Sequence, residues 1–228
     1  MKVLLTGFDA FGGESVNASW LAVHALGGQT IAGHTVVAAM LPTVFESSVG
    51  ELSRLMRLHR PAWVVCVGQA GGRDRLSIEQ VAINFQDATI ADNAGYQPSG
   101  TPVVAGGPAA YFSTLPVSAM LFALQQAGIP AEISQTAGTF VCNHVFYTLM
   151  HALSSSPKAT RPRGGFIHVP FLPDQGAPSM RLDQIISGLH CAVEAAITSL
   201  QGDATNSSEM TVKAANAPRV NGKEKTRS

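Results

Sequence analysis

The chain has 228 residues, of which 46% are hydrophobic and 13% are charged, and its formal net charge is zero. This composition is typical of a globular protein with one sizeable core, and it excludes an intrinsically disordered chain. The balanced charge gives no sign of binding to nucleic acid or to an anionic membrane, and no apolar run is long enough to span a bilayer.

Apolar strands and amphipathic helices alternate along most of the chain. Strands are predicted at residues 2–8, 34–41, 62–72, 79–88, 131–138 and 164–170. Helices are predicted between and after them at residues 17–26, 44–59, 117–128, 138–153 and 182–200. Residues 92–116 are rich in glycine and proline, which predicts a loop or hairpin excursion. The alternation indicates an α/β fold, a three-layer α/β/α sandwich around a central, mostly parallel, twisted sheet.

The composition changes near residue 203, where the apolar content falls sharply. We therefore predict a single domain over residues 1–202 and a disordered C-terminal tail over residues 203–228. At the other end, the first apolar strand is too short for a secretory signal, so a cytoplasmic enzyme is the default expectation.

The segment GTFVCNHVFYTLMHAL places Cys142 near the start of a predicted helix. Free N–H groups and partial positive charge at a helix start favour a thiolate, which predicts a lowered pKa for this thiol. Cys66 lies inside an apolar strand and Cys191 inside the last helix, so both are predicted to be packing residues. Three cysteines at unrelated spacings predict neither a disulfide framework nor a zinc site, and we expect no metal and no cofactor. Position alone leaves Cys142 open to a second interpretation, as a small buried hydrophobe.

A nucleophilic thiol needs a base and a group that orients this base. His168 ends the strand predicted at residues 164–170, at the sheet edge where Cys142 is also expected. His144 is a poor partner because residues two apart on a helix point in different directions. The other histidines are predicted to be structural: His24, His34, His59, His151 and His190. Spacing does not choose among the candidates for the orienting carboxylate: Asp9, Asp74, Glu79, Asp87 and Asp92.

The chain contains, in this order, LLTGFDAFGGESVNAS, VGQAGGRDRLSIEQVAINFQDATIADNAGYQP, SQTAGTFVCNHVFY and GGFIHVPFLPDQ. Together these segments resemble the pyroglutamyl-peptidase I family, also called pyrrolidone-carboxylate peptidases. The resemblance spans residues 1 to about 200 and implies a cytoplasmic cysteine peptidase that removes an N-terminal pyroglutamyl residue from peptides. It also implies a homo-oligomer, either a dimer or a tetramer.

The resemblance implies a triad in which Cys142 is the nucleophile, His168 the base and Glu79 the orienting carboxylate. It further implies a substrate pocket made by Phe8, Phe11, Asn17, Gln69, Phe140 and Val141. Each of these pocket residues also has an ordinary structural explanation, and a helix N-cap would fully account for Asn17.

Two residues depart from the family, which usually has DARIPDN where this chain has DATIADN. Thr89 replaces the arginine and Ala91 the proline, which predicts weaker catalysis and a more mobile loop. Two hypotheses compete with this interpretation. The first, which the loss of the arginine supports, is a catalytically weak or silent homologue that binds pyroglutamyl groups. The second, which rests on fold analogy alone, is a nucleoside-phosphorylase-like enzyme of related fold. A phosphate-binding P-loop is excluded because Glu14 stands where that motif needs lysine.

Overall fold

The computed structural model describes residues 1–157 and 160–215, and only the backbone of residues 201–215. Seven strands form the central sheet: β1 (Lys2–Phe8), β2 (Thr30–Ile31), β3 (His34–Leu41), β4 (Trp63–Gln69), β5 (Leu76–Glu79), β8 (Ala131–Ser134) and β9 (Arg163–Val169). Two short strands, β6 (Val81–Ile83) and β7 (Ala110–Phe112), pair apart from it. The helices are α1 (Ala18–Leu26), α2 (Phe45–His59), α3 (Val117–Gln126), α4 (Val141–Ser154), α5 (Leu182–Ala215) and a 3-10 turn η1 (Pro173–Gln175).

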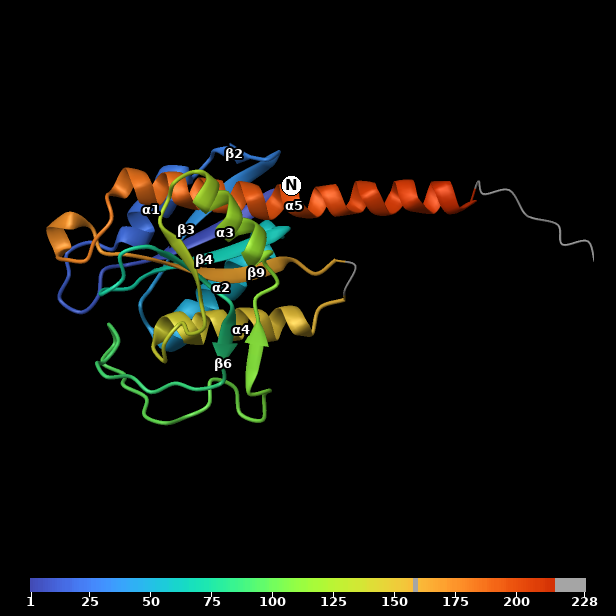
Figure 1. The fold of residues 1–228 in the computed structure, drawn as a ribbon. Helices are drawn as coiled ribbons and strands as arrows, with labels where there is room; N and C mark the ends of the chain where they lie inside the picture. Colours follow the sequence, from blue (N-terminus) through green and yellow to red (C-terminus); the bar gives the residue numbers. More distant parts are fainter. Residues whose placement is uncertain (158–159, 216–228) are drawn as a thin grey trace, which may run out of the picture.

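The sheet has the strand order β2-β3-β1-β4-β9-β5-β8. Its central strands β3, β1, β4 and β9 are parallel, whereas β2 and β5 each run antiparallel to a neighbour. Helices α1, α3 and α5 lie on one side of the sheet, and α2 and α4 lie on the other (Figure 1). The predicted three-layer sandwich with a mostly parallel sheet is confirmed.

Each face of the sheet has its own core. All seven residues of β4 are buried because helices cover both of its faces, which explains why its sequence is continuously apolar rather than alternating. Val65 and Val67 join the core under α1, α3 and α5, whereas Val64 and Cys66 join the core under α2 and α4. The difference between the faces matters for the site because α4, which carries Cys142, covers only the face on which Val64 and Cys66 lie.

The strand predicted at residues 79–88 is wrong in its position. Glu79 ends β5 rather than beginning a strand, and the chain turns at Gln80 to pair β6 with β7. Within β6, Ala82 is fully buried while Val81 and Ile83 are half-buried, so the buried face is the reverse of the expected one. The reason is that β6 packs on α4, not on the central sheet.

Helix α5 continues past the predicted domain end. It runs to Ala215, so residues 203–215 are helical where we expected a disordered tail; residues 216–228 lie outside the described part. Residues 203–215 contain neither glycine nor proline and include several good helix formers, which is compatible with continuation of the helix.

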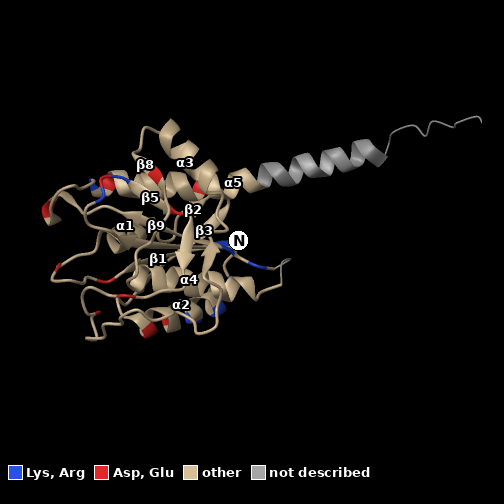
Figure 2. Ribbon diagram, turned by 60° about the horizontal axis from the view of Figure 1, so that its bottom comes forward, with Lys and Arg blue, Asp and Glu red and all other residues tan. Residues whose placement is uncertain are grey.

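Charged residues lie mostly in loops and helices, with both signs interspersed (Figure 2). None of the helices in the described part of the chain is both long and apolar enough to cross a membrane.

Candidate active site

Cys142 is the second residue of α4, directly after the turn that joins β8 to this helix. Gly138 makes this turn possible because its φ of 76° lies in the left-handed region that glycine favours. The N-cap residue is Phe140, whose apolar side chain makes no capping hydrogen bond. The N–H groups of the first helical turn are therefore not satisfied by a side-chain cap, and they lie beside the thiol.

Gly68 provides the space for this thiol. A Cβ atom built on Gly68 would lie 2.8 Å from Cys142 Sγ, which no real side chain tolerates. Gly68 of β4 is paired in register with His168 of β9. The thiol is thus packed against the strand position next to the candidate base, as the sheet-edge argument predicted.

Glu79 and His168 are joined directly. The Nδ1–H of His168 donates to Glu79 Oε1 over 2.7 Å, and both side chains are almost completely buried. In the antiparallel pairing of β5 with β9, Ser77 lies opposite His168 and Glu79 lies opposite Phe166. Residues two apart on a strand share a face, so the carboxylate and the imidazole lie on the same face of the sheet. Because Nδ1 carries the proton in this hydrogen bond, Nε2 is left as the basic nitrogen.

Burial dominates the electrostatics of these groups. It raises the pKa of the Cys142 thiol to about 12, and the charge of Glu79 acts in the same direction. The expected lowering of this pKa is therefore wrong, because desolvation outweighs the partial positive charge at the helix start. Burial also lowers the pKa of His168, although its hydrogen bond to Glu79 opposes this. These directions favour a neutral thiol beside a neutral imidazole, with Cys142 half-buried rather than fully enclosed.

The carboxylate of Glu79 is ionised. Burial pushes its pKa upward, but the hydrogen bond from His168 and the positive charge of Arg73 hold the pKa below its ordinary value. Arg73 donates from Nη1 to the same oxygen, Oε1, over 2.7 Å.

The other histidines have structural partners or no role at the site. His144 contacts Gln86 Oε1 through Nδ1 at 2.9 Å, and His34 contacts Ala32 O at 3.0 Å. Cys66 is fully buried, with a pKa that burial raises to about 12. In the described part of the chain, no group of three or more His, Cys, Asp or Glu side chains is placed to hold a metal ion.

Of the six pocket residues that the resemblance implies, Phe11 and Phe140 form a pair beside the nucleophile. Their ring centroids are 6.0 Å apart, and both rings are half-buried. Phe140 directly precedes α4, and Val141 beside it is fully buried in the core. Contact of these residues with a substrate stays a prediction.

The remaining three pocket candidates have structural roles. Phe8 is 2% exposed and packs on Phe166, with ring centroids 6.3 Å apart. Asn17 caps α1 by accepting from Ser19 N, as its N-cap interpretation predicted. Gln69 points to the face opposite Gly68, where its Oε1 accepts from Ala18 N over 2.7 Å. Their part in substrate binding also stays a prediction, for which the structure offers these competing explanations.

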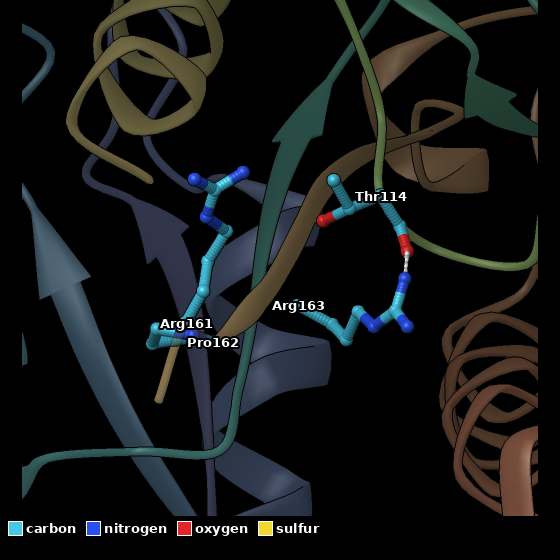
Figure 3. A pocket seen from close by; sticks show the side chains of 4 residues that line it. All are labelled: Thr114, Arg161, Pro162 and Arg163. Atoms are coloured by element: carbon cyan, nitrogen blue, oxygen red, sulfur yellow. Dashed lines mark hydrogen bonds between the residues drawn. The ribbon is translucent and has the colours of Figure 1, made fainter. Parts of the chain in front are cut away.

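A separate pocket lies at the other end of β9 (Figure 3). It is lined by Thr114, Arg161, Pro162 and Arg163 and has a volume of about 260 Å³. Backbone carbonyls already occupy both guanidinium groups: Arg161 donates to Ser154 O, and Arg163 donates to Thr114 O. Because β9 begins at Arg163 and reaches His168 five residues later, this pocket is not part of the site.

The sequence analysis gave no role to two residues of the site, although both lie at the end of a predicted strand. Gly68 carries no chemistry, and only its contact with α4 shows why a side chain is excluded. Arg73 directly follows the glycine turn after β4, and a cation at the end of a strand was the signal that could have drawn attention to it.

A sequence model of the pyroglutamyl peptidase family matches residues 1–199. The chain belongs to the pyroglutamyl peptidase family. It is 57% identical over 197 residues to pyrrolidone-carboxylate peptidase 1 of Ralstonia nicotianae, which covers 84% of this chain and 91% of that protein. It is 53% identical over 201 residues to the pyrrolidone-carboxylate peptidase of Cupriavidus necator, with coverage of 86% and 93%.

Solved structures of pyroglutamyl peptidases share the fold. The crystal structure of pyroglutamyl peptidase I from Bacillus amyloliquefaciens is 48% identical, with a TM-score of 0.82, and the match covers 86% of this chain and 96% of that chain. A mutant pyrrolidone carboxyl peptidase from Pyrococcus furiosus is 38% identical, with a TM-score of 0.84 and coverage of 88% and 100%. The resemblance drawn from the four sequence segments is confirmed.

Proposed function

We propose that this chain is a cysteine exopeptidase that hydrolyses the amide bond after an N-terminal pyroglutamyl residue. The observation that carries the proposal is the hydrogen bond of 2.7 Å between Glu79 and His168, next to the strand position against which the Cys142 thiol packs. Membership of the pyroglutamyl peptidase family supports the substrate class.

Acylation begins from the neutral pair. As Cys142 Sγ attacks the carbonyl carbon of the pyroglutamyl residue, His168 Nε2 takes the thiol proton, and the carbonyl oxygen becomes an oxyanion. Glu79 stabilises the imidazolium that forms and keeps the second proton on Nδ1. Collapse of the tetrahedral intermediate breaks the C–N bond, and the leaving amine takes the proton from His168.

Hydrolysis of the thioester repeats these steps with water. His168 Nε2 accepts a proton from the attacking water, the C–S bond breaks, and the thiolate recovers a proton from the imidazolium. Free pyroglutamate leaves, and the neutral thiol and imidazole are restored.

The oxyanion is stabilised by the helix that carries the nucleophile. The N-cap Phe140 offers no side-chain acceptor, so the first N–H groups of α4 are available to the developing negative charge. The same groups favour this charge through the helix dipole.

Phe11 and Phe140 are the residues that best suit the flat, uncharged lactam ring. We expect F11A and F140A each to raise KM by about tenfold, because apolar contact area is lost from a small ring. F122A is the matched control: Phe122 lies on α3 and is 62% exposed, and its removal leaves KM unchanged. If F11A and F140A both keep the wild-type KM, the ring does not bind between them.

The family resemblance also suggests a cytoplasmic homo-oligomer, a dimer or a tetramer. Exposed aromatic rings support assembly, since Phe112 is 68% and Phe85 is 41% exposed around the β6–β7 hairpin. Light scattering at micromolar concentration tests the assembly, and a monomeric mass would contradict it. Fractionation of the native cells tests the location.

Turnover of a pyroglutamyl-amide reporter tests the activity itself. Release of the amine by the wild-type chain supports the proposal. Binding of pyroglutamate without turnover would instead support a silent homologue, and phosphate-dependent cleavage of a nucleoside would support the phosphorylase-like alternative.

A further inference from the structure

Arg73 lies in the loop between β4 and β5 and contacts two parts of the site at once. Its Nη1 donates to Glu79 Oε1 over 2.7 Å, and its Nη2 donates to Thr136 O over 3.2 Å. Glu79 belongs to the carboxylate side of the triad, whereas Thr136 belongs to the turn that leads to Cys142. A single guanidinium thus bridges the carboxylate and the turn that precedes the nucleophile.

The contact with Glu79 compensates the negative charge of a buried carboxylate. Glu79 is completely buried, and a buried carboxylate is costly unless a charged or hydrogen-bonded partner compensates it. His168 supplies a hydrogen bond but is neutral, because burial lowers its pKa. The positive charge that pairs with Glu79 is the guanidinium of Arg73, whose Nη1 lies 2.7 Å from Oε1.

The contact with Thr136 has a geometric consequence. Thr136 is held on its other sides by the short segment itself, where its N–H donates to Ser134 Oγ and its Oγ1 accepts from Gly138 N. The carbonyl bound by Arg73 therefore belongs to a compact turn, which sets where α4 begins and where the thiol is placed. A planar guanidinium donates in two directions at fixed geometry, which an ammonium group does not do.

We propose that Arg73 is a positioning residue of the triad, which keeps Glu79 ionised and directed at His168 and fixes the turn before Cys142. The inference rests on the proposed peptidase function. Turnover by the wild-type chain tests that function separately from any effect of Arg73.

The charged and titratable groups around His168 are few. Glu79 of β5 and Arg73 of the β4–β5 loop act on its charge, and the Cys142 thiol of α4 packs against Gly68, the residue paired with His168. The charge of Arg73 disfavours the imidazolium, so it lowers the pKa of His168. Loss of this charge raises both that pKa and the pKa of Glu79, and activity needs a neutral His168 and an ionised Glu79. The acid limb of the pH–rate profile must then move to higher pH.

The test compares R73M, R73K and R75M. Arg75 is the matched control because it lies two residues along the same loop, pairs with Asp74 and is 45% exposed. With the reporter, we expect R73M to lower kcat by about 10- to 100-fold at little change in KM and to shift the acid limb upward. R75M keeps the wild-type values. R73K keeps the charge but not both contacts, so its kcat falls less and its acid limb stays near that of the wild type.

A second readout follows the Nδ1–H proton of His168 by NMR. Its signal disappears or moves in R73M and is retained in R75M, which a role in folding alone does not predict. Circular dichroism shows whether R73M is folded, and if it is not, the kcat of R73K decides. A folded R73M with the kcat and acid limb of the wild type overturns the inference, as does a wild-type kcat in R73K when R73M is unfolded.

Discussion

Glu79 and His168 meet diagonally across two antiparallel strands, with 2.7 Å between Oε1 and Nδ1. The residue opposite His168 is Ser77, and Glu79 lies two residues further along β5, so its carboxylate reaches the imidazole diagonally. This hydrogen bond fixes the tautomer of His168. Its contribution to kcat can be measured by substitution of Glu79.

E79Q is expected to lower kcat by about 10³- to 10⁴-fold with little change in KM. The amide fills the same space but no longer stabilises the imidazolium or selects the tautomer. Steady-state kinetics on the reporter measures the effect. E51Q is the control, because Glu51 forms only a partly exposed pair with Arg54 on α2. An E79Q variant with wild-type kcat would remove Glu79 from the mechanism.

Gly68 is expected to tolerate no side chain. In G68A, the new Cβ would lie 2.8 Å from Cys142 Sγ and 2.8 Å from the ring of Phe166, and relief of this overlap must displace one of them. We expect a loss of about 1–3 kcal/mol in the free energy of unfolding, together with a large loss of kcat.

The control for this substitution is G50A on α2, where a new Cβ meets no atom within 4 Å. Replacing glycine by alanine inside a helix stabilises by about 1 kcal/mol, so G50A raises the midpoint of urea unfolding and leaves kcat unchanged. If G68A and G50A had the same urea midpoint and the same kcat, the close contact between Gly68 and Cys142 would contribute to neither stability nor activity.

The neutral thiol–imidazole pair predicts a particular pH profile. The proposed mechanism needs neutral His168, whose pKa burial lowers below the ordinary 6.5, so we expect kcat/KM to fall only as the pH drops below that value. The thiol pKa of about 12 predicts that no descending limb follows from its ionisation near neutral pH. A pH series on the reporter checks this. A bell-shaped profile whose descending limb titrates near neutral pH would indicate a preformed thiolate–imidazolium pair instead.

The same burial of His168 affects stability. Its folded pKa is lower than its unfolded pKa, so the unfolded chain binds more protons and the folded state loses stability as the pH falls below about 6.5.

Much of the site could be predicted from the sequence, because strand ends of a mostly parallel sheet collect functional residues. This rule located Cys142 and His168 before any family was considered. It did not select Glu79, because the antiparallel insertion of β5 beside β9 depends on pairing between residues 89 positions apart. Nor could it give the pKa of the thiol, since desolvation depends on packing of α4 against β4.

The strand predicted at residues 79–88 shows a related limit. The alternation of Val81, Ile83 and Phe85 is real, but Val81 and Ile83 belong to a strand that pairs with β7 in a separate two-stranded sheet. Asn143 on α4 holds this segment through hydrogen bonds to Ile83 and Phe85. A local pattern gives the period of a strand and not the partner against which it packs.

The domain boundary predicted near residue 202 gives a truncation experiment. Side chains of α5 are described up to Leu200, and the fully buried ones include Ile185, Leu189 and Ile197. A chain that ends at residue 202 keeps these core residues, and we expect thermal unfolding and kcat like those of the full chain. A chain that ends at residue 190 loses Ile197 from the core and is expected not to fold. Loss of folding in the chain that ends at residue 202 would contradict the boundary.

Hydrolysis of a pyroglutamyl-amide reporter by the wild-type chain and by C142A, C66A and C191A tests the central claim most directly. The account predicts turnover by the wild type, by C66A and by C191A, with C66A less stable because its side chain leaves a cavity in the core. It predicts that C142A, although folded, releases no amine above the uncatalysed rate. Residual turnover by C142A close to that of the wild type would contradict the assignment of Cys142 as the nucleophile.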